Sequence, residues 1–274
     1  MPLRAAWWSP LLRGRIGLVV LRSKEIMLLD RIYQLAAASF VAFIPLTVVV
    51  ATMVDNGGNS VAEQMVRRFD LRGNAADTVR DLLNHEEHGI YWLGLVIVAW
   101  SAFSLGRRLS ATYTTIWGVA RLRVRQQWRA AVWVLIGIVN IISVGFLREI
   151  ANGRARSVLV VTVVIGLALW FGAELLSQYL LTGGQVVVRR LLVAALLVTL
   201  GKIGMTAWAE FYMPRMLGLQ ANMYGPLGVV FVMFTFLAVS MAVLLVATLI
   251  AAVWTAPKSE LPTEHEVREE FRAS

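Results

Sequence analysis

Two charged side chains within apolar stretches are the residues of this sequence best suited to chemistry. Glu174 lies in the stretch 157–181 and Lys202 in the stretch 190–211. A charge at the centre of a bilayer costs about 2.5–3.5 kcal/mol on insertion scales, so such residues face a bundle interior, pair, or line a water-filled cavity. Both residues lie at similar depths if the two stretches are consecutive spans. One hypothesis is an ion pair at a polar cavity, and the alternatives are a static structural pair or independent snorkelling of Lys202.

Three further polar residues extend this pair into a candidate translocation path. Gln178 follows Glu174 by one helical turn and shares its face. Asn140 lies in the apolar stretch 129–147, and Glu210 follows Lys202 by eight residues. Together with Glu174 and Lys202 they could line one polar path. The alternative is a set of interhelical hydrogen bonds that only hold the helices together.

Other chemistry has little support in the sequence. The cluster His85-Glu86-Glu87-His88 carries ligand types that suit a divalent metal. It lacks the spacing of the H-E-x-x-H motif, however, and a polar helix end at the headgroups explains it without a metal. Cysteine is absent, and no phosphate-binding glycine loop or serine nucleophile elbow occurs. We therefore expect no catalytic residue, no metal and no cofactor. Nuclease or protease activity is not expected.

The composition identifies the elements that must position these residues. Of the 274 residues, 58% are hydrophobic and 16% are charged, and the mean hydropathy is +0.67. A soluble domain is roughly 45–50% apolar and about 25% charged. A continuous apolar run of about 20 residues crosses the hydrocarbon core as a helix. The sequence therefore predicts an all-α polytopic membrane protein with six transmembrane helices, at residues 32–54, 90–107, 129–147, 157–181, 190–211 and 226–254.

The turn between the last two spans is predicted at Tyr224-Gly225-Pro226, because residues 216–257 form one uncharged run that is too long for a single span. Small residues favour close helix packing in lipid. They gather at Ser101, Ala102, Ser104 and Gly106 in the second span, and at Gly201, Gly204 and Ala207 in the fifth. We expect close helix approaches at these positions.

The distribution of Lys and Arg predicts the orientation. The net charge is +9, and one side of the predicted topology carries 17 basic and 7 acidic residues against 8 and 9 on the other. The positive-inside rule places the basic side, with both termini, in the cytoplasm. A nucleic-acid-binding patch is the rival explanation of the charge, and we do not expect one. The predicted domains are an N-terminal segment 1–31, a transmembrane domain 32–254 and an acidic tail 255–274.

Amphipathic segments lie outside the predicted spans. Residues 5–29 are predicted as one or two cytoplasmic helices on the membrane surface. The extracytoplasmic loop 55–88 has the capping pattern of two short amphipathic helices, which could form a lid or a partner surface or simply pack on the helix ends. Pro45 lies in the middle of the first span and predicts a kink there, either a gating element or a tolerated structural proline.

Three short segments resemble the YihY/BrkB family of bacterial inner-membrane proteins. The first runs from Ala36-Ala37-Ala38-Ser39-Phe40 to Phe43-Ile44-Pro45-Leu46. The second runs from Leu109-Ser110-Ala111-Thr112-Tyr113 to Ile116-Trp117-Gly118, and the third is Tyr224-Gly225-Pro226-Leu227-Gly228. Two segments depart from the family pattern. Thr182-Gly183-Gly184 stands where many relatives have a Pro-Asn pair. Leu245-Val246-Ala247-Thr248 lacks the glutamate that relatives often have late in the last helix. The resemblance implies six spans and an envelope protein with suspected transport or lipid handling. The family's former label as a ribonuclease finds no support in these residues.

The leading functional hypothesis is a transporter, or a lipid or solute translocation factor, that uses the polar face of Glu174, Gln178, Lys202 and Asn140. Pro45 and the loop 55–88 would gate it. The alternative is a scaffold that does not transport and binds an envelope partner through that loop or the tail. Membrane lipids are the expected partners, a homo-oligomer is permitted, and nucleic acid is not expected.

Overall fold

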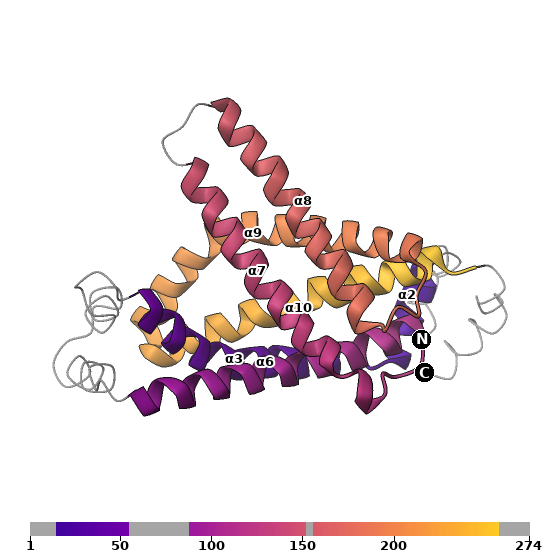
Figure 1. Ribbon diagram of the computed structural model, residues 1–274, viewed down its shortest axis with the longest axis horizontal. Helices are drawn as coiled ribbons and strands as arrows, with labels where there is room; N and C mark the ends of the chain where they lie inside the picture. The colour runs from indigo at the N-terminus through magenta and orange to yellow at the C-terminus, as the bar shows by residue number, and fades with distance from the viewer. Residues whose placement is uncertain (1–14, 55–87, 152–155, 258–274) are drawn as a thin grey trace, which may run out of the picture. The chain divides into compact units, whose positions relative to one another are not determined.

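The computed structural model describes residues 15–54, 88–151 and 156–257, which are helical apart from short connections (Figure 1). The helices are α2 (Arg15–Glu25), α3 (Leu28–Val54), α6 (His88–Trp117), α7 (Trp128–Ala151), α8 (Arg156–Leu181), α9 (Val188–Tyr224) and α10 (Pro226–Thr255). A short 3-10 turn, Val124–Gln126, precedes α7. The described residues contain no strand, so the predicted all-α class is confirmed.

Four of the described helices are long and apolar enough to cross a membrane. The qualifying segments are Trp128–Leu147 in α7, Val160–Leu181 in α8, Val188–Gln220 in α9 and Leu227–Thr255 in α10. Helices α2 and α3 meet at a 60° bend and together qualify as a fifth, broken span. The described part of α6 does not qualify by the same test. The integral membrane character is therefore supported by four or five helices, and six spans remain a prediction.

The chain divides into two compact units, residues 38–105 and residues 1–37 with 106–274. The first unit holds most of α3 and the first part of α6. In the second unit α7 packs against α8, α8 against α9, and α9 against α10, while α2 lies against α10. Every residue of the candidate site that the structure brings together belongs to this second unit.

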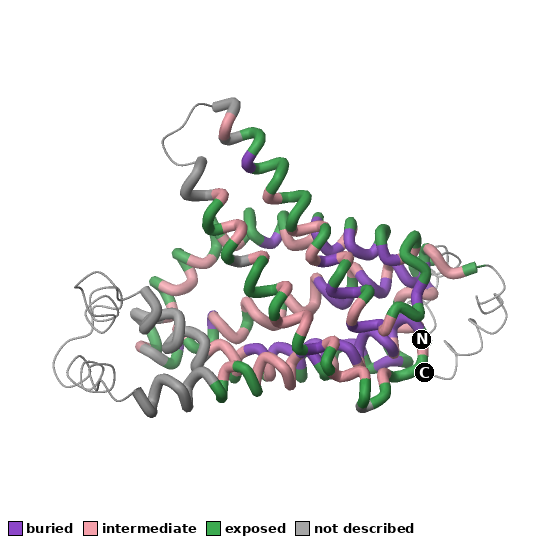
Figure 2. Tube along the Cα trace, in the orientation of Figure 1, coloured by how far each residue is buried: buried purple, intermediate pink, exposed green. Residues whose placement is uncertain are grey.

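The core of the second unit lies toward one end of its helices. Figure 2 shows buried positions gathered near the start of α9 and the end of α10. The buried residues of these segments include Leu191, Val198, Leu245 and Leu249. In contrast, α7 and α8 expose large apolar side chains along much of their length, among them Ile142 and Val164. Contiguous apolar exposure of this extent is untenable in water and suits contact with lipid.

Glycines make the two tight turns that connect α8, α9 and α10. Gly183 and Gly184 have φ angles of 74° and 71°, which glycine adopts without the steric cost that other residues meet. Between α9 and α10, Gly225 has a φ of 61° and Pro226 occupies the first position of α10. The predicted break at Tyr224-Gly225-Pro226 is therefore confirmed, because proline fits a first helical turn and cannot continue the preceding helix.

Two helices continue beyond the spans that the sequence predicts. Helix α6 reaches Trp117 although its apolar run ends at Gly106, and α9 reaches Tyr224 although the predicted span ends at Phe211. Charged residues end an apolar run but do not end a helix, so Arg107, Arg108 and Glu210 lie within helices. Pro214 also lies inside α9. Proline is tolerated in membrane helices where neighbouring groups satisfy the freed carbonyl.

Several predictions concern residues outside the described ranges. These are the helices of the loop 55–88 up to residue 87, the cluster at His85-Glu86-Glu87, the tail from residue 258, and residues 1–14. The described part of the N-terminal segment forms the helix α2, and its placement on the membrane surface stays a prediction. Pro45 lies within the continuous helix α3, and its side chain is outside the description.

Two of the predicted small residues make close helix approaches. An added Cβ at Gly201 would lie 2.6 Å from Val243 Cγ1, so α9 and α10 meet closely there. An added Cβ at Gly106 would lie 3.0 Å from the Trp133 ring, which places α6 against α7. Gly204, in contrast, has open space around it. Small residues thus mark close packing only on the face that a neighbouring helix covers.

Candidate functional site

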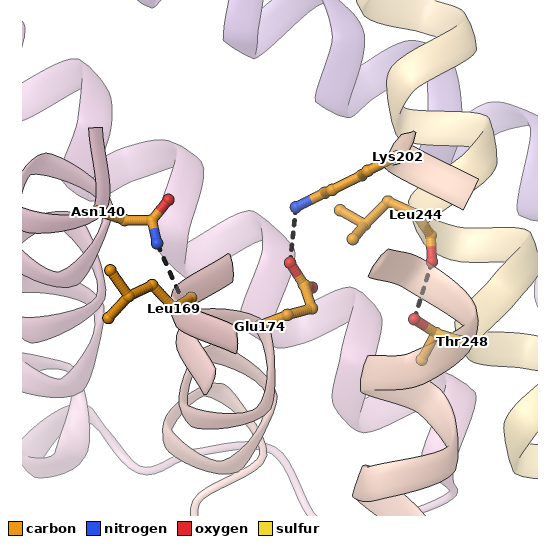
Figure 3. Close-up of polar contacts among 6 residues, drawn as sticks. All are labelled: Asn140, Leu169, Glu174, Lys202, Leu244 and Thr248. Carbon is orange, nitrogen blue, oxygen red and sulfur yellow. Dashed lines mark hydrogen bonds and ion pairs between the residues drawn. The ribbon is translucent and has the colours of Figure 1, made fainter. Parts of the chain in front are cut away.

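The two buried charges of the sequence meet directly in the structure. Lys202 Nζ on α9 lies 2.6 Å from Glu174 Oε2 on α8 (Figure 3). Helices α8 and α9 are joined by a short turn and run antiparallel. Residues at similar depths on the two helices, such as Glu174 and Lys202, therefore lie opposite one another. The predicted ion pair is therefore confirmed, while the cavity beside it remains a prediction.

Two hydroxyl residues complete a polar contact between four helices. The Tyr113 side chain of α6 lies within hydrogen-bonding range of both Glu174 and Thr248 of α10. Thr248 is fully buried and donates its hydroxyl to the Leu244 carbonyl at 2.8 Å (Figure 3). Helices α6, α8, α9 and α10 thus converge around the Glu174 carboxylate, which accepts a hydrogen bond from Lys202 and lies near the Tyr113 hydroxyl.

The two members of the ion pair differ in exposure. The Glu174 side chain is 7% exposed and the Lys202 side chain is 32% exposed. Removing one partner of a buried pair leaves an uncompensated charge, which is strongly unfavourable. The carboxylate is therefore buried inside the bundle, and Lys202 is the more exposed member of the pair.

Two buried polar side chains near the pair lack hydrogen-bond partners among the described residues. The atoms concerned are the amide nitrogen and oxygen of Gln178 and the hydroxyl oxygen of Thr199. Gln178 is 0% exposed and Thr199 is 6% exposed. An unsatisfied buried polar group costs about 1–3 kcal/mol. The packing of the four helices accounts for the ion pair but supplies no partner for these polar atoms.

The remaining predicted path residues lie apart from this pair. Asn140 Nδ2 donates to the Leu169 carbonyl at 3.3 Å, a bond that joins α7 to α8 (Figure 3). Its geometry fits the alternative in which an interhelical hydrogen bond holds the bundle. The Glu210 side chain is exposed on α9. The structure thus brings together Glu174, Lys202 and Gln178 and leaves Asn140 and Glu210 outside their contacts.

A second polar region closes the end of the bundle at which α9 begins. Ser110 Oγ donates to the Leu181 carbonyl at 2.7 Å, and Gln185 Nε2 donates to the Ala120 carbonyl at 2.9 Å. The Arg190 guanidinium lies 5.6 Å from the Trp117 ring centroid, and its Nε donates to Thr255 Oγ1 at 3.3 Å. These contacts connect α6, α8, α9 and α10 at the end of the bundle where α9 begins.

Comparison with protein families decides the relationship of the chain. The family model described as virulence factor BrkB matches residues 22–270. The chain belongs to the BrkB family. The match covers all of the residues that form the site and confirms the resemblance found in the three sequence segments. No curated protein and no solved structure matches the chain.

Sequence reasoning missed three members of this BrkB-family site: Tyr113, Thr199 and Thr248. Tyr113 is part of the segment Leu109–Tyr113 that carries the family resemblance, and that was the only signal for it. Thr248 was noticed only as a departure from the glutamate of relatives. Threonine gives no signal in an apolar helix because its hydroxyl can bond the carbonyl one turn back, as Thr248 does.

Proposed function

We propose that this BrkB-family protein moves a polar solute or a lipid headgroup across the bacterial inner membrane, along the polar face around Glu174 and Lys202. The observation that carries the proposal is an ion pair in the apolar bundle, flanked by buried polar atoms that have no partners in the described chain. Well-packed apolar residues often replace a buried ion pair without loss of stability. A transported polar group gives the pair and its unsatisfied neighbours a use that packing does not.

The proposed topology has six spans with both termini in the cytoplasm. Helix α6 is 30 residues long, about 45 Å at 1.5 Å per residue, which exceeds the roughly 30 Å hydrocarbon core. Amphipathic helices at the N-terminus and in the loop 55–88 would lie at the interface, and that loop and Pro45 would gate the path. The protein acts without enzymatic chemistry or a cofactor, on membrane lipids or solutes, alone, as a homo-oligomer or with an envelope partner.

Reconstitution tests the proposal directly. The purified protein is placed in liposomes that carry fluorescent lipid, and exchange between the leaflets is measured. We expect the wild type to accelerate exchange, and Glu174→Gln and Lys202→Met to abolish the acceleration. Glu210→Gln is the matched control, because it removes one carboxylate from an exposed position of α9. It should exchange lipid at the wild-type rate.

The contrary result is also defined. A folded wild type that leaves lipid exchange at the rate of empty liposomes excludes unaided lipid movement. Solute-loaded liposomes then provide the second arm, with efflux of small polar solutes as the measurement. Inactivity in both arms, together with capture of an envelope protein by residues 55–88 or the tail, would favour the scaffold function.

A further inference from the structure

We propose that the group held at this site is zwitterionic, an ammonium joined to a phosphate or carboxylate, and that Gln178 and Thr199 help to bind it. This inference rests on the proposed function and names its class of substrate. It follows from the juxtaposition of one positive, one negative and two unpartnered neutral polar side chains on facing helices.

The four residues form one continuous polar set. Gln178 follows Glu174 by four residues on α8, and Lys202 follows Thr199 by three residues on α9. Side chains at these spacings are neighbours on one helix face. The 2.6 Å contact between Glu174 and Lys202 joins the two faces. Gln178 and Thr199 therefore flank the pair on the side toward the Thr182–Gly184 turn.

Charge balance decides between a zwitterion and a simple ion. The pair is neutral as a whole, and Glu174 is almost completely buried. An anion that took Lys202 for itself would leave the Glu174 carboxylate with Tyr113 alone, inside a medium that penalises an uncompensated charge. A zwitterion supplies a cation to Glu174 and an anion to Lys202 at the same time. This exchange replaces both interactions within one ligand and buries no net charge.

The neutral polar groups match the same ligand. The Gln178 amide offers two donor hydrogens and an acceptor, and the Thr199 hydroxyl offers one donor hydrogen and acceptor capacity. Their polar atoms are buried and lack partners in the described chain. A phosphate or carboxylate accepts from the donors, and an ammonium donates to the Gln178 carbonyl oxygen. The part of Lys202 that is exposed provides the first point of contact.

Ligand binding to the purified full-length chain tests the inference. Binding is followed by the rise in thermal stability with ligand concentration, which reports affinity for the folded state. The probes are short-chain phosphatidylethanolamine, short-chain phosphatidylglycerol, free phosphoethanolamine, glycine, inorganic phosphate and ethanolamine. We expect the zwitterions to bind about tenfold or more tightly than phosphate or ethanolamine alone, because each adds a charge-assisted contact. The lipid and free forms distinguish a headgroup from a soluble solute.

Variants separate a binding role from a structural one. Gln178→Leu should fold as well as the wild type, because it removes unpartnered polar atoms, yet bind zwitterions about tenfold more weakly. Glu174→Gln should shift the preference toward phosphate, and Lys202→Met should shift it toward ethanolamine. Glu210→Gln should bind as the wild type does.

Two outcomes would overturn the inference. One is phosphate or ethanolamine that binds as tightly as the zwitterions, and the other is the absence of binding by any zwitterion. Lipid exchange that still required Glu174 and Lys202 would then leave the proposed function standing. Zwitterion binding without exchange or efflux would support the inference and contradict the proposed function.

Discussion

Glu174 and Lys202 stabilise each other in a position where either charge alone would be unfavourable. The carboxylate is almost completely buried and has Tyr113 as a polar neighbour, whereas Lys202 keeps about a third of its side chain exposed. Loss of Lys202 should therefore leave the more deeply buried charge without compensation, and loss of Glu174 should leave a cation that can still reach polar surroundings by snorkelling.

A double-mutant cycle measures this interdependence. Lys202→Met is expected to destabilise the fold more than Glu174→Gln, and the double variant should lose less than the sum of the two. Groups in contact show coupling energies of about 0.5–3 kcal/mol. The free energy of unfolding in mixed micelles is the measurement. The control cycle joins Lys202→Met with Glu210→Gln, where additive losses are expected. Additive losses in the first cycle as well would show that the pair contributes nothing to stability.

At the residue scale, prediction from sequence succeeded for charges and failed for hydroxyls. A charge within an apolar run has a large insertion cost, so Glu174 and Lys202 were conspicuous. Thr199 and Thr248 were not, because a threonine costs little anywhere in a membrane helix. Their roles depend on which helix faces which. Asn140 was grouped with the pair on polarity alone, and the structure instead gives it a backbone partner at Leu169.

Among the elements, α9 and α10 form a contact whose closeness depends on one glycine. Gly201 faces Val243, and no Cβ fits between them without movement of a β-branched side chain. Gly204 lies one turn further along α9 with nothing within 4 Å of the corresponding position. The same substitution at the two sites therefore separates packing from intrinsic helix propensity.

Gly201→Ala is expected to destabilise the protein by about 1–3 kcal/mol, the range of overpacked cores. Gly204→Ala should be neutral or stabilise by up to about 1 kcal/mol, since alanine is the better helix former. Unfolding of both variants under identical detergent conditions is the measurement. Equal effects of the two substitutions would show that α9 and α10 do not meet closely at Gly201.

Helix existence was predictable here, and helix ends were not. Runs of apolar residues located every described helix from α3 to α10, because only a helix satisfies the backbone in lipid. The predicted spans ended at Arg107 and at Phe211, where the helices continue. The extension of α6 places Tyr113 near Glu174 of the ion pair. The end of an apolar run indicates where the hydrocarbon core ends. The helix itself can continue into the interface, so the run does not predict its last residue.

On the scale of the whole molecule, charge asymmetry and helix count must agree on one topology. The exposed arginines Arg121, Arg123 and Arg125 lie in the connection between α6 and α7, and Arg189 lies at the start of α9. The turn between α9 and α10 at Tyr224-Gly225-Pro226 carries no charge. The positive-inside rule predicts that the Arg-rich end lies in the cytoplasm. It is also the end at which the buried core is concentrated.

Parity makes this topology testable. The four clear spans and the bent α2–α3 pair give five crossings. Five crossings would put the two termini on opposite sides of the membrane. If α6 also crosses, there are six crossings and the termini lie on the same side. The chain contains no cysteine, so single cysteines report their own position to an impermeant thiol reagent. We expect Ser9→Cys, Ala120→Cys and Ser274→Cys to react only from the cytoplasm, and Ser60→Cys only from outside. If Ser60→Cys and Ala120→Cys react from the same side, α6 does not cross. The proposed path would then lack the second of its six spans.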